Sequence, residues 1–313
     1  MSGTSDGLRP ASPSMRGGAD RDRPSGWDVE SPTLARIRRE VYGDEYPEEV
    51  RPRSFVTRSE LRHFARELRI GPGQTFIDIG CGQGGPSLWV ARETGTSLVG
   101  IDVSSDGISH AVARARDMGR ADRARFEVAD AAATELSAAS FDAAMSVDTL
   151  WAIPDRAAAL REVARVLRPG ARFVFTNWDR DLSPPGYPPP VDDHRPLLEA
   201  TGFQVEAYEI QPDAERLRRI FYERLVAARP ELARESGEEG AKKLTYGAEA
   251  TLGLIDGRDY LAHSRRIFVV ARAMPFAEVH RWSAFRHCFA HDRPPGIRRA
   301  PRRDGQRAGI TFA

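Results

Sequence analysis

The chain has 313 residues, which is enough for one large domain or two small ones. Hydrophobic residues make up 41% of it and charged residues 29%, an ordinary composition for a soluble globular enzyme. The formal net charge of +1 argues against nucleic acid or an anionic membrane as a partner, and no apolar run approaches the ~20 residues of a membrane span. Two cysteines, Cys81 and Cys288, do not predict a disulfide framework, so we expect a cytoplasmic protein.

The N-terminal part of the chain predicts a tail followed by two helices. Residues 1–28 lack the apolar side chains that offset ordering entropy, and they contain no apolar core of a signal peptide, so we expect a disordered tail. Apolar residues recur at helical spacing over 34–41. A second helix is predicted over 57–68, where Thr57 and Glu60 have the spacing of a capping box.

The middle of the chain alternates between apolar runs and helical patterns. Such alternation predicts right-handed βαβ units and a parallel sheet covered on both faces. The sequence Arg168-Pro169-Gly170 is expected to end a helix and turn the chain into the fifth strand. The predicted strands are 74–79, 97–102, 124–129, 141–147 and 171–177, and the predicted helices are 85–94, 105–118 and 155–167.

After the fifth strand the regular alternation of strand and helix patterns ends. The proline-rich segment 183–190 predicts an extended loop near the carboxyl edge of the sheet. A helix over 192–200 and a strand over 203–210 follow, and the last strand is predicted over 266–272. Between them lies the charged helical pattern of 213–257, which we expect to cover one edge of the sheet and to contribute to the substrate site.

These boundaries predict a single α/β domain over residues 29–274. Residues 275–313 are rich in arginine, glycine and proline and have scattered aromatic residues. That composition favours a disordered basic tail over a nucleic-acid-binding segment.

The most informative stretch runs from Phe76 to Gly85, where a buried strand is expected to break into a glycine loop that opens a helix. Glycine is needed where a backbone turns with positive φ or lies against a ligand. Asp78 stands two positions before the first glycine, and Asp102 ends the next apolar strand. Acids and glycines in this arrangement hold a nucleoside cofactor at the carboxyl edge of a parallel sheet.

The loop also satisfies the dinucleotide pattern, with Gly80, Gly82 and Gly85 at the required spacing. A pyrophosphate is repelled by a carboxylate beside the helix N-terminus, whereas an ammonium group is attracted by it. Asp78 at that position therefore favours a cofactor with an amino-acid end, and Asp102 is placed to accept bonds from a ribose diol. S-adenosylmethionine has both ends.

Residues from about 40 to 274 resemble class I S-adenosylmethionine-dependent methyltransferases of the small-molecule, natural-product type. The similarity is carried by Phe76–Gly85, Val99–Ser104, Phe126–Ala131, and Phe141–Asp148 together with Val166–Phe173. It implies a Rossmann-like, doubly wound, seven-stranded sheet whose last strand is antiparallel. It also implies that Asp130 and Ala131 meet the adenine. The cofactor-binding residues expected on this basis are Asp78, Gly80, Cys81, Gly82, Gly84, Asp102, Val103, Asp130, Ala131 and Val147.

The chain departs from the family pattern after the fourth strand. Many relatives have a histidine there, whereas this chain has Asp148 followed by Trp151 and no histidine. Trp151 is therefore a candidate for flanking the transferred methyl group or for packing in the core. The lysine-and-acid set of metal-dependent catechol methyltransferases and the Asn-Pro-Pro-Tyr signature of amino methyltransferases are both unrecognisable here, so no metal is expected.

Methylation of a hydroxyl group requires a base that removes its proton, whereas an amine or an enolic carbon depends less on such a base. His194 and Asp148 are the candidate catalytic residues, and His194 leads because it follows the proline-rich loop. Asp179, His63 and Tyr187 are further candidates. In the helical segment we expect Phe221 and Tyr246 to line the acceptor cavity with Trp151.

The sequence thus predicts a monomeric or homodimeric enzyme that transfers a methyl group from S-adenosylmethionine to an O, N or C atom of a small molecule, with neither nucleic acid nor membrane as partner. Three alternatives stay open. One is a relative that binds the cofactor and performs another reaction, such as a cyclisation. The second is an NAD-dependent oxidoreductase, although no Tyr-x-x-x-Lys site lies in the right region. The third is a non-catalytic or RNA-associated protein, supported only by the basic tail.

Overall fold

The computed structural model describes residues 31–184 and 186–275. The expected tails, 1–28 and 275–313, lie outside this range apart from Pro275. The helices are α1 (Pro32–Tyr42), α2 (Arg58–Glu67), α3 (Gly85–Thr94), α4 (Ser105–Asp117), α5 (Arg156–Val166), α6 (Arg195–Ala200), α7 (Ala214–Ala227) and α8 (Arg229–Thr251). The strands are β1 (Thr75–Ile79), β2 (Ser97–Asp102), β3 (Ala124–Val128), β4 (Phe141–Val147), β5 (Leu167–Arg180), β6 (Phe203–Ile210) and β7 (Ser264–Ala273).

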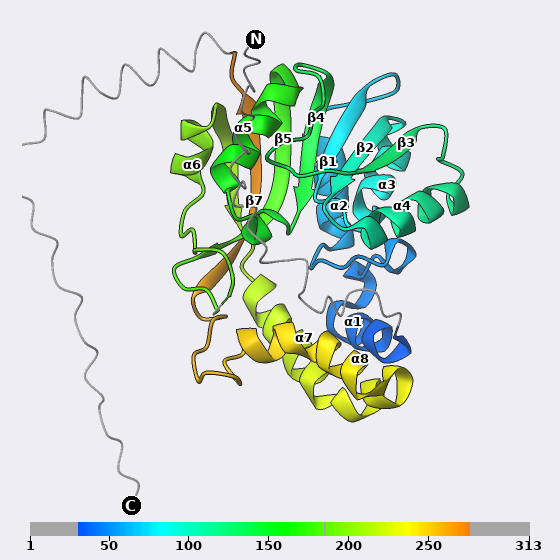
Figure 1. The fold of residues 1–313 in the computed structure, drawn as a ribbon, viewed down its shortest axis with the longest axis vertical. Helices are drawn as coiled ribbons and strands as arrows, with labels where there is room; N and C mark the ends of the chain where they lie inside the picture. The colour runs from blue at the N-terminus through cyan, green and yellow to red at the C-terminus, as the bar shows by residue number, and fades with distance from the viewer. Residues whose placement is uncertain (1–30, 185, 276–313) are drawn as a thin grey trace, which may run out of the picture. The chain divides into compact units, whose positions relative to one another are not determined.

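The seven strands form one sheet in the order β3-β2-β1-β4-β5-β7-β6 (Figure 1). Strands β1 to β5 pair in parallel, while β7 is antiparallel to both β5 and β6. The predicted fold class is therefore confirmed, including the antiparallel last strand and the helical insertion before it. Strand order reverses between β1 and β4, and such a reversal places the ligand site of a doubly wound sheet at its carboxyl edge.

Side chains alternate between the two faces of the sheet, and each face has its own apolar core. Phe76 of β1 packs with α2, α3 and α4, whereas its neighbour Ile77 packs with α5 and α6. The capping box at the start of α2 is formed as predicted, because Thr57 accepts the amide proton of Glu60 and Glu60 accepts that of Thr57.

The fifth strand begins earlier than expected. Leu167 leaves α5 with extended backbone angles and already pairs with Phe141. The register then shifts, so that Ala143 pairs with Arg172, and Gly170 adopts a φ of 84° within the extra residues. The sequence Arg168-Pro169-Gly170 thus makes an exposed bulge inside β5 instead of a turn before it.

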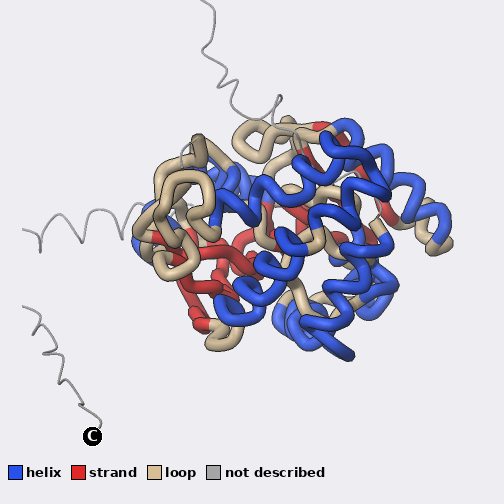
Figure 2. The backbone as a smooth tube through the Cα atoms, turned by 90° about the horizontal axis from the view of Figure 1, so that it is seen from below, coloured by secondary structure: helices blue, strands red, loops and turns tan. Residues whose placement is uncertain are grey.

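A third apolar cluster joins α1, α7 and α8, and it includes Ile37, Phe221 and Leu232. Figure 1 shows these helices gathered below the strands, and Figure 2 views them from that side, in front of the sheet. Helix α8 is kinked at Gly237, whose φ is 73° and ψ 169°. No helix in the described ranges is long and apolar enough to cross a membrane.

Candidate functional site

The glycine loop after β1 has the backbone that only glycine adopts easily. Gly80, Gly82 and Gly84 all have positive φ, of 70°, 51° and 70°. A Cβ on Gly80 would lie 2.1 Å from the methyl carbon of Thr149, so this glycine is required for packing. A Cβ on Gly82 would meet nothing within 4 Å, so this glycine faces open space. The loop is therefore fastened to the fold at its start and open toward a ligand further along.

Asp78 lies at the base of this loop and is almost completely buried. Its Oδ1 has no hydrogen-bond partner in the structure, although the atom is inaccessible to solvent. Burial, opposed by a bond from Ser87 and reinforced by the charge of Asp102, raises the pKa of Asp78 to about 7. An unpartnered carboxylate oxygen of this kind fits a cationic group that completes the site.

Asp102 closes the same loop from the end of β2. One carboxylate oxygen accepts the amide proton of Gly82 at 2.8 Å, and the other accepts that of Ser104 at 2.9 Å. Each oxygen keeps a lone pair for a further donor such as a ribose hydroxyl. Beside it Val103 is 67% exposed and Val128, at the end of β3, is 57% exposed, so two apolar side chains are available to a flat ring.

The other residues expected to bind the cofactor lie along the same edge. Cys81 is buried, and the amides of Gly80 and Cys81 both donate to the carbonyl of Ile101 at 2.9 Å. Asp130 is exposed after β3, where it accepts the amide proton of Ala132, with Ala131 half-buried beside it. Val147 is half-buried at the end of β4. The structure therefore places all the expected cofactor residues at the ends of β1 to β4.

Asp148, one candidate base, is held in a buried ion cluster. Both of its carboxylate oxygens accept bonds from Arg266 of β7, at 3.3 and 3.0 Å, and one also accepts the amide proton of Phe55 at 3.0 Å. Arg266 also pairs with Glu60 of α2. Burial works against the charge of Arg266, but the two acids outweigh it and raise the pKa of the guanidinium. Asp148 has a φ of 51°, so its backbone is held in the left-handed region.

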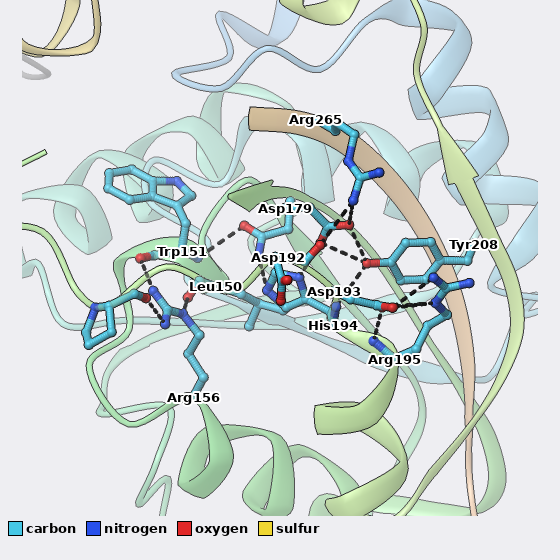
Figure 3. A network of polar contacts seen from close by, with 12 residues as sticks. Leu150, Trp151, Arg156, Asp179, Asp192, Asp193, His194, Arg195, Tyr208 and Arg265 are labelled. Carbon is cyan, nitrogen blue, oxygen red and sulfur yellow. Dashed lines mark hydrogen bonds and ion pairs between the residues drawn. The ribbon is translucent and has the colours of Figure 1, made fainter. Parts of the chain in front are cut away.

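His194, the other candidate base, lies in a buried polar network (Figure 3). Its Nδ1 is 2.7 Å from Asp179, which also accepts a bond from the hydroxyl of Tyr208 at 2.8 Å. Its Nε2 is 2.9 Å from the amide nitrogen of Asn177, whose oxygen accepts the backbone N–H of Trp151 at 3.1 Å. These bonds fix the orientation of the ring, with the proton on Nδ1 and a lone pair on Nε2 that Asn177 occupies.

Trp151 connects this network to the surface. Its indole N–H donates to the carbonyl of Asp148 at 2.6 Å, and its ring stacks on that of Tyr187 at 5.5 Å. Trp151 also lines a small cavity with His194, Trp178, Arg180 and residues of the proline-rich loop. Trp151 and His194 thus line the same small cavity.

Phe221 and Tyr246, the two residues of the helical segment expected to line the acceptor cavity, lie in different environments. Phe221 is buried in the cluster of α1, α7 and α8, with its ring 6.0 Å from that of Phe55. Tyr246 is 44% exposed on α8, so its position does not support a role in lining a cavity. Among the lesser candidates, His63 is stacked on Phe268 at 4.1 Å, away from the His194 network.

Several residues of this region were not predicted from the sequence. They are Glu60, Asn177, Arg180, Tyr208, Arg218 and Arg266. The available signal was an arginine or an amide within an otherwise apolar strand, as at Asn177, Arg180 and Arg266. Within the described residues no group of three or more His, Cys, Asp or Glu could hold a metal ion. A larger cavity of about 410 Å³, lined by residues such as Glu215, Arg219 and Leu261, contains none of the predicted site residues.

The comparisons with known proteins agree with this geometry. Residues 77–175 match the family described as "Methyltransferase domain". The chain is 34% identical over 131 residues to the methyltransferase GfsG of Streptomyces halstedii, covering 42% of this chain but only 47% of GfsG, so it spans about half of that relative. It is 31% identical over 164 residues to the O-methyltransferase rstn1 of Aspergillus nomiae, covering 48% of this chain and 73% of the relative.

Among solved structures, the [4+2]-cyclase SpnF superposes with a TM-score of 0.61 at 22% identity, covering 77% of this chain and 93% of SpnF. At that identity the likeness bears on the fold alone. The sequence matches supply the family: this chain belongs to the class I S-adenosylmethionine-dependent methyltransferases.

Proposed function

We propose that this protein transfers a methyl group from S-adenosylmethionine to an oxygen, nitrogen or carbon atom of a small organic molecule. The observation that carries the proposal is Asp78, a buried carboxylate with an unpartnered oxygen beneath the open glycine loop. A cationic amino group completes its bonding, and a dinucleotide pyrophosphate would be repelled there. GfsG and rstn1, both named as methyltransferases, support the same reaction class.

Different residues at the carboxyl edge of the sheet would bind different parts of the cofactor. Asp78 would receive the ammonium group, and Asp102 the ribose hydroxyls, each by charge-assisted hydrogen bonds. The exposed side chains of Val103 and Val128 would flank the adenine, with Asp130 at its amino group. When bound, S-adenosylmethionine supplies an already activated methyl group, so the chain's own task is chiefly alignment.

Alignment of the acceptor falls to the side of the site formed by Trp151, His194 and helices α1, α7 and α8, which we call the helical layer. Holding two reactants in line contributes roughly 7–11 kcal/mol of barrier reduction. Where the acceptor is a hydroxyl, we propose His194 as the base, because Asp179 orients its ring and it lines the small cavity. Its Nε2 would accept the proton once the acceptor hydroxyl replaces the amide of Asn177. Asp148, engaged by Arg266, would position Phe55 and Trp151.

Two measurements test the proposal. Calorimetry of the full chain should show binding of S-adenosylmethionine and none of NAD. Incubation with S-adenosylmethionine and a panel of small organic acceptors should convert the cofactor to S-adenosylhomocysteine and add one methylene unit to an acceptor, detected by mass spectrometry. Tight binding of NAD, or failure to bind S-adenosylmethionine, would contradict the proposed function.

A further inference from the structure

Three buried arginines lie where the helical layer faces the sheet. Arg38 comes from α1, Arg180 from the end of β5 and Arg218 from α7, and they are only 6%, 9% and 5% exposed. We call these three residues the arginine cluster. Arginine is almost never buried to this extent unless it is paired.

The arginine cluster has no carboxylate partner among the described residues. Arg38 donates to the backbone carbonyl of Ser54 at 3.0 Å. The Nε of Arg218 is buried without a hydrogen-bond partner, and the side chain of Arg180 contacts the ring of Trp151 and no carboxylate of the described ranges. Buried charges without counter-charges are costly, so this arrangement calls for an anion that the described residues do not provide.

Acids on the adjoining elements have other partners. Asp148 and Glu60 both pair with Arg266, which therefore carries one positive charge against two negative ones. Asp179 is bound by His194 and Tyr208 and lies 3.7 Å from Arg265. None of these carboxylates pairs with the arginine cluster.

Aromatic rings hold the guanidinium groups in place. Arg218 lies over Trp178 at 4.1 Å from the ring centroid, with Tyr222 at 5.1 Å, and Arg180 lies over Trp151 at 5.0 Å. Cation–π contact offsets part of the desolvation, but it occupies the face of a guanidinium and leaves the N–H groups at its edge free for hydrogen bonds. Burial, together with the charge of Arg218, lowers the pKa of Arg180 to about 9, so the two cations lie close enough to repel each other.

The strand that carries Arg180 is not one of those that carry the acids proposed to bind the cofactor. The acids proposed to hold the cofactor, Asp78 and Asp102, end β1 and β2. Arg180 ends β5, two strands beyond β1, where it lines the small cavity with Trp151 and His194. The arginines Arg180 and Arg218 therefore lie away from the acids proposed to hold the amino-acid end and the ribose of the cofactor.

We propose that the methyl acceptor carries an oxyanion, a carboxylate or a phosphate, that is bound by Arg180 and Arg218. Guanidinium groups match both anions through paired N–H donors. Binding of the anion neutralises the repulsion between the two arginines and fixes the acceptor beneath α7. This inference rests on the proposed function, since it names the chemical class of the acceptor of that same site.

Inorganic phosphate and acetate serve as probes in the full chain saturated with S-adenosylhomocysteine. Calorimetry should detect binding of at least one of them, and the bound probe identifies the kind of anion. Arg180→Gln and Arg218→Gln should each weaken that binding about ten- to hundredfold, as expected for the loss of a charge-assisted hydrogen bond. Arg180→Lys and Arg218→Lys, which retain the charge, should weaken it less. Arg216→Gln, on an exposed arginine of the same helix, is the matched control and should leave binding unchanged.

The affinity for S-adenosylmethionine is measured in parallel for every variant. It should stay within about threefold of the original protein, because the arginines are proposed to meet the acceptor. Absence of phosphate and acetate binding by the original protein would overturn the proposal, as would equal weakening by Arg216→Gln. A tenfold loss of S-adenosylmethionine affinity in the Arg218 variants would overturn it too, by assigning the cluster to the cofactor's carboxylate. Failure of the original protein to bind S-adenosylmethionine would instead contradict the proposed function.

Discussion

The two halves of the carboxyl edge of the sheet are built in opposite ways. Over β1, β2 and β3 the site is acidic, and its residues lie in short stretches directly after each strand, as Asp78 and Asp102 do. Over β4, β5 and β7 it is rich in arginine and aromatic rings, and the contacts join distant parts of the chain, as between Asp148 and Arg266. The half proposed to bind the cofactor follows local sequence patterns. The half proposed to bind the acceptor depends instead on the side chains that helices α1, α7 and α8 bring over the strands.

The largest expected effect lies on the acceptor side, at the ion cluster. Arg266→Ala would leave Asp148 and Glu60 buried together without a counter-charge, which we expect to cost about 3–5 kcal/mol of unfolding free energy. Chemical denaturation measures this loss. Arg265→Ala, at the exposed neighbouring arginine, is the control and should change stability by less than about 1 kcal/mol. Equal losses in the two variants would show that the cluster contributes nothing specific.

On the cofactor side, Asp102→Ala should weaken S-adenosylmethionine binding about tenfold or more. The variant loses the charge-assisted acceptor of the ribose, worth roughly 1.5–3 kcal/mol, and also the bond that holds the amide of Gly82. Calorimetry measures the affinity, and Asp106→Ala, an exposed acid in the first turn of α4, is the control. Unchanged affinity in Asp102→Ala would place the ribose elsewhere.

The cofactor half could be predicted from the sequence because its geometry follows from neighbouring residues. The glycine loop, the acids at the strand ends and the order of strands all come from local patterns that the parallel sheet brings to one edge. The acceptor half could not be predicted in the same way. Arg218 and Trp178 are 40 positions apart, and no periodicity indicates that one will stack on the other. Local spacing also could not show that Asn177 would occupy the free nitrogen of His194.

The cofactor half should also respond to pH through Asp78. Its pKa of about 7 in the folded protein lies above the usual 3.8, so between about pH 4 and 7 the folded chain holds a proton that the unfolded chain has released. Raising the pH across this window should therefore destabilise the cofactor-free protein. Conversely, the ammonium group of S-adenosylmethionine needs the ionised carboxylate, so binding should release a proton and weaken by up to about tenfold for each pH unit below 7.

Calorimetry in buffers of different ionisation enthalpy measures that proton release. In Asp78→Asn the pH dependence should disappear, together with much of the affinity, because the amide cannot ionise. A pH dependence that persists in Asp78→Asn would assign the titration to another group.

The smallest effect expected on cofactor binding comes from the helical layer. Phe221→Leu keeps most of the apolar volume in the cluster of α1, α7 and α8 while removing the ring that packs against Phe55. If the layer serves the acceptor, S-adenosylmethionine affinity should change by less than about threefold, near ~0.7 kcal/mol. Methyl transfer to an acceptor found in the panel of small organic acceptors should fall much further, because the layer is proposed to align the acceptor and Phe55 would lose the ring that it packs against. Tyr246→Ala, at an exposed position of α8, should change neither quantity. Parallel losses of cofactor affinity and turnover in a folded Phe221→Leu protein would mean that the helical layer closes over the cofactor, and the division between the two halves would then be wrong.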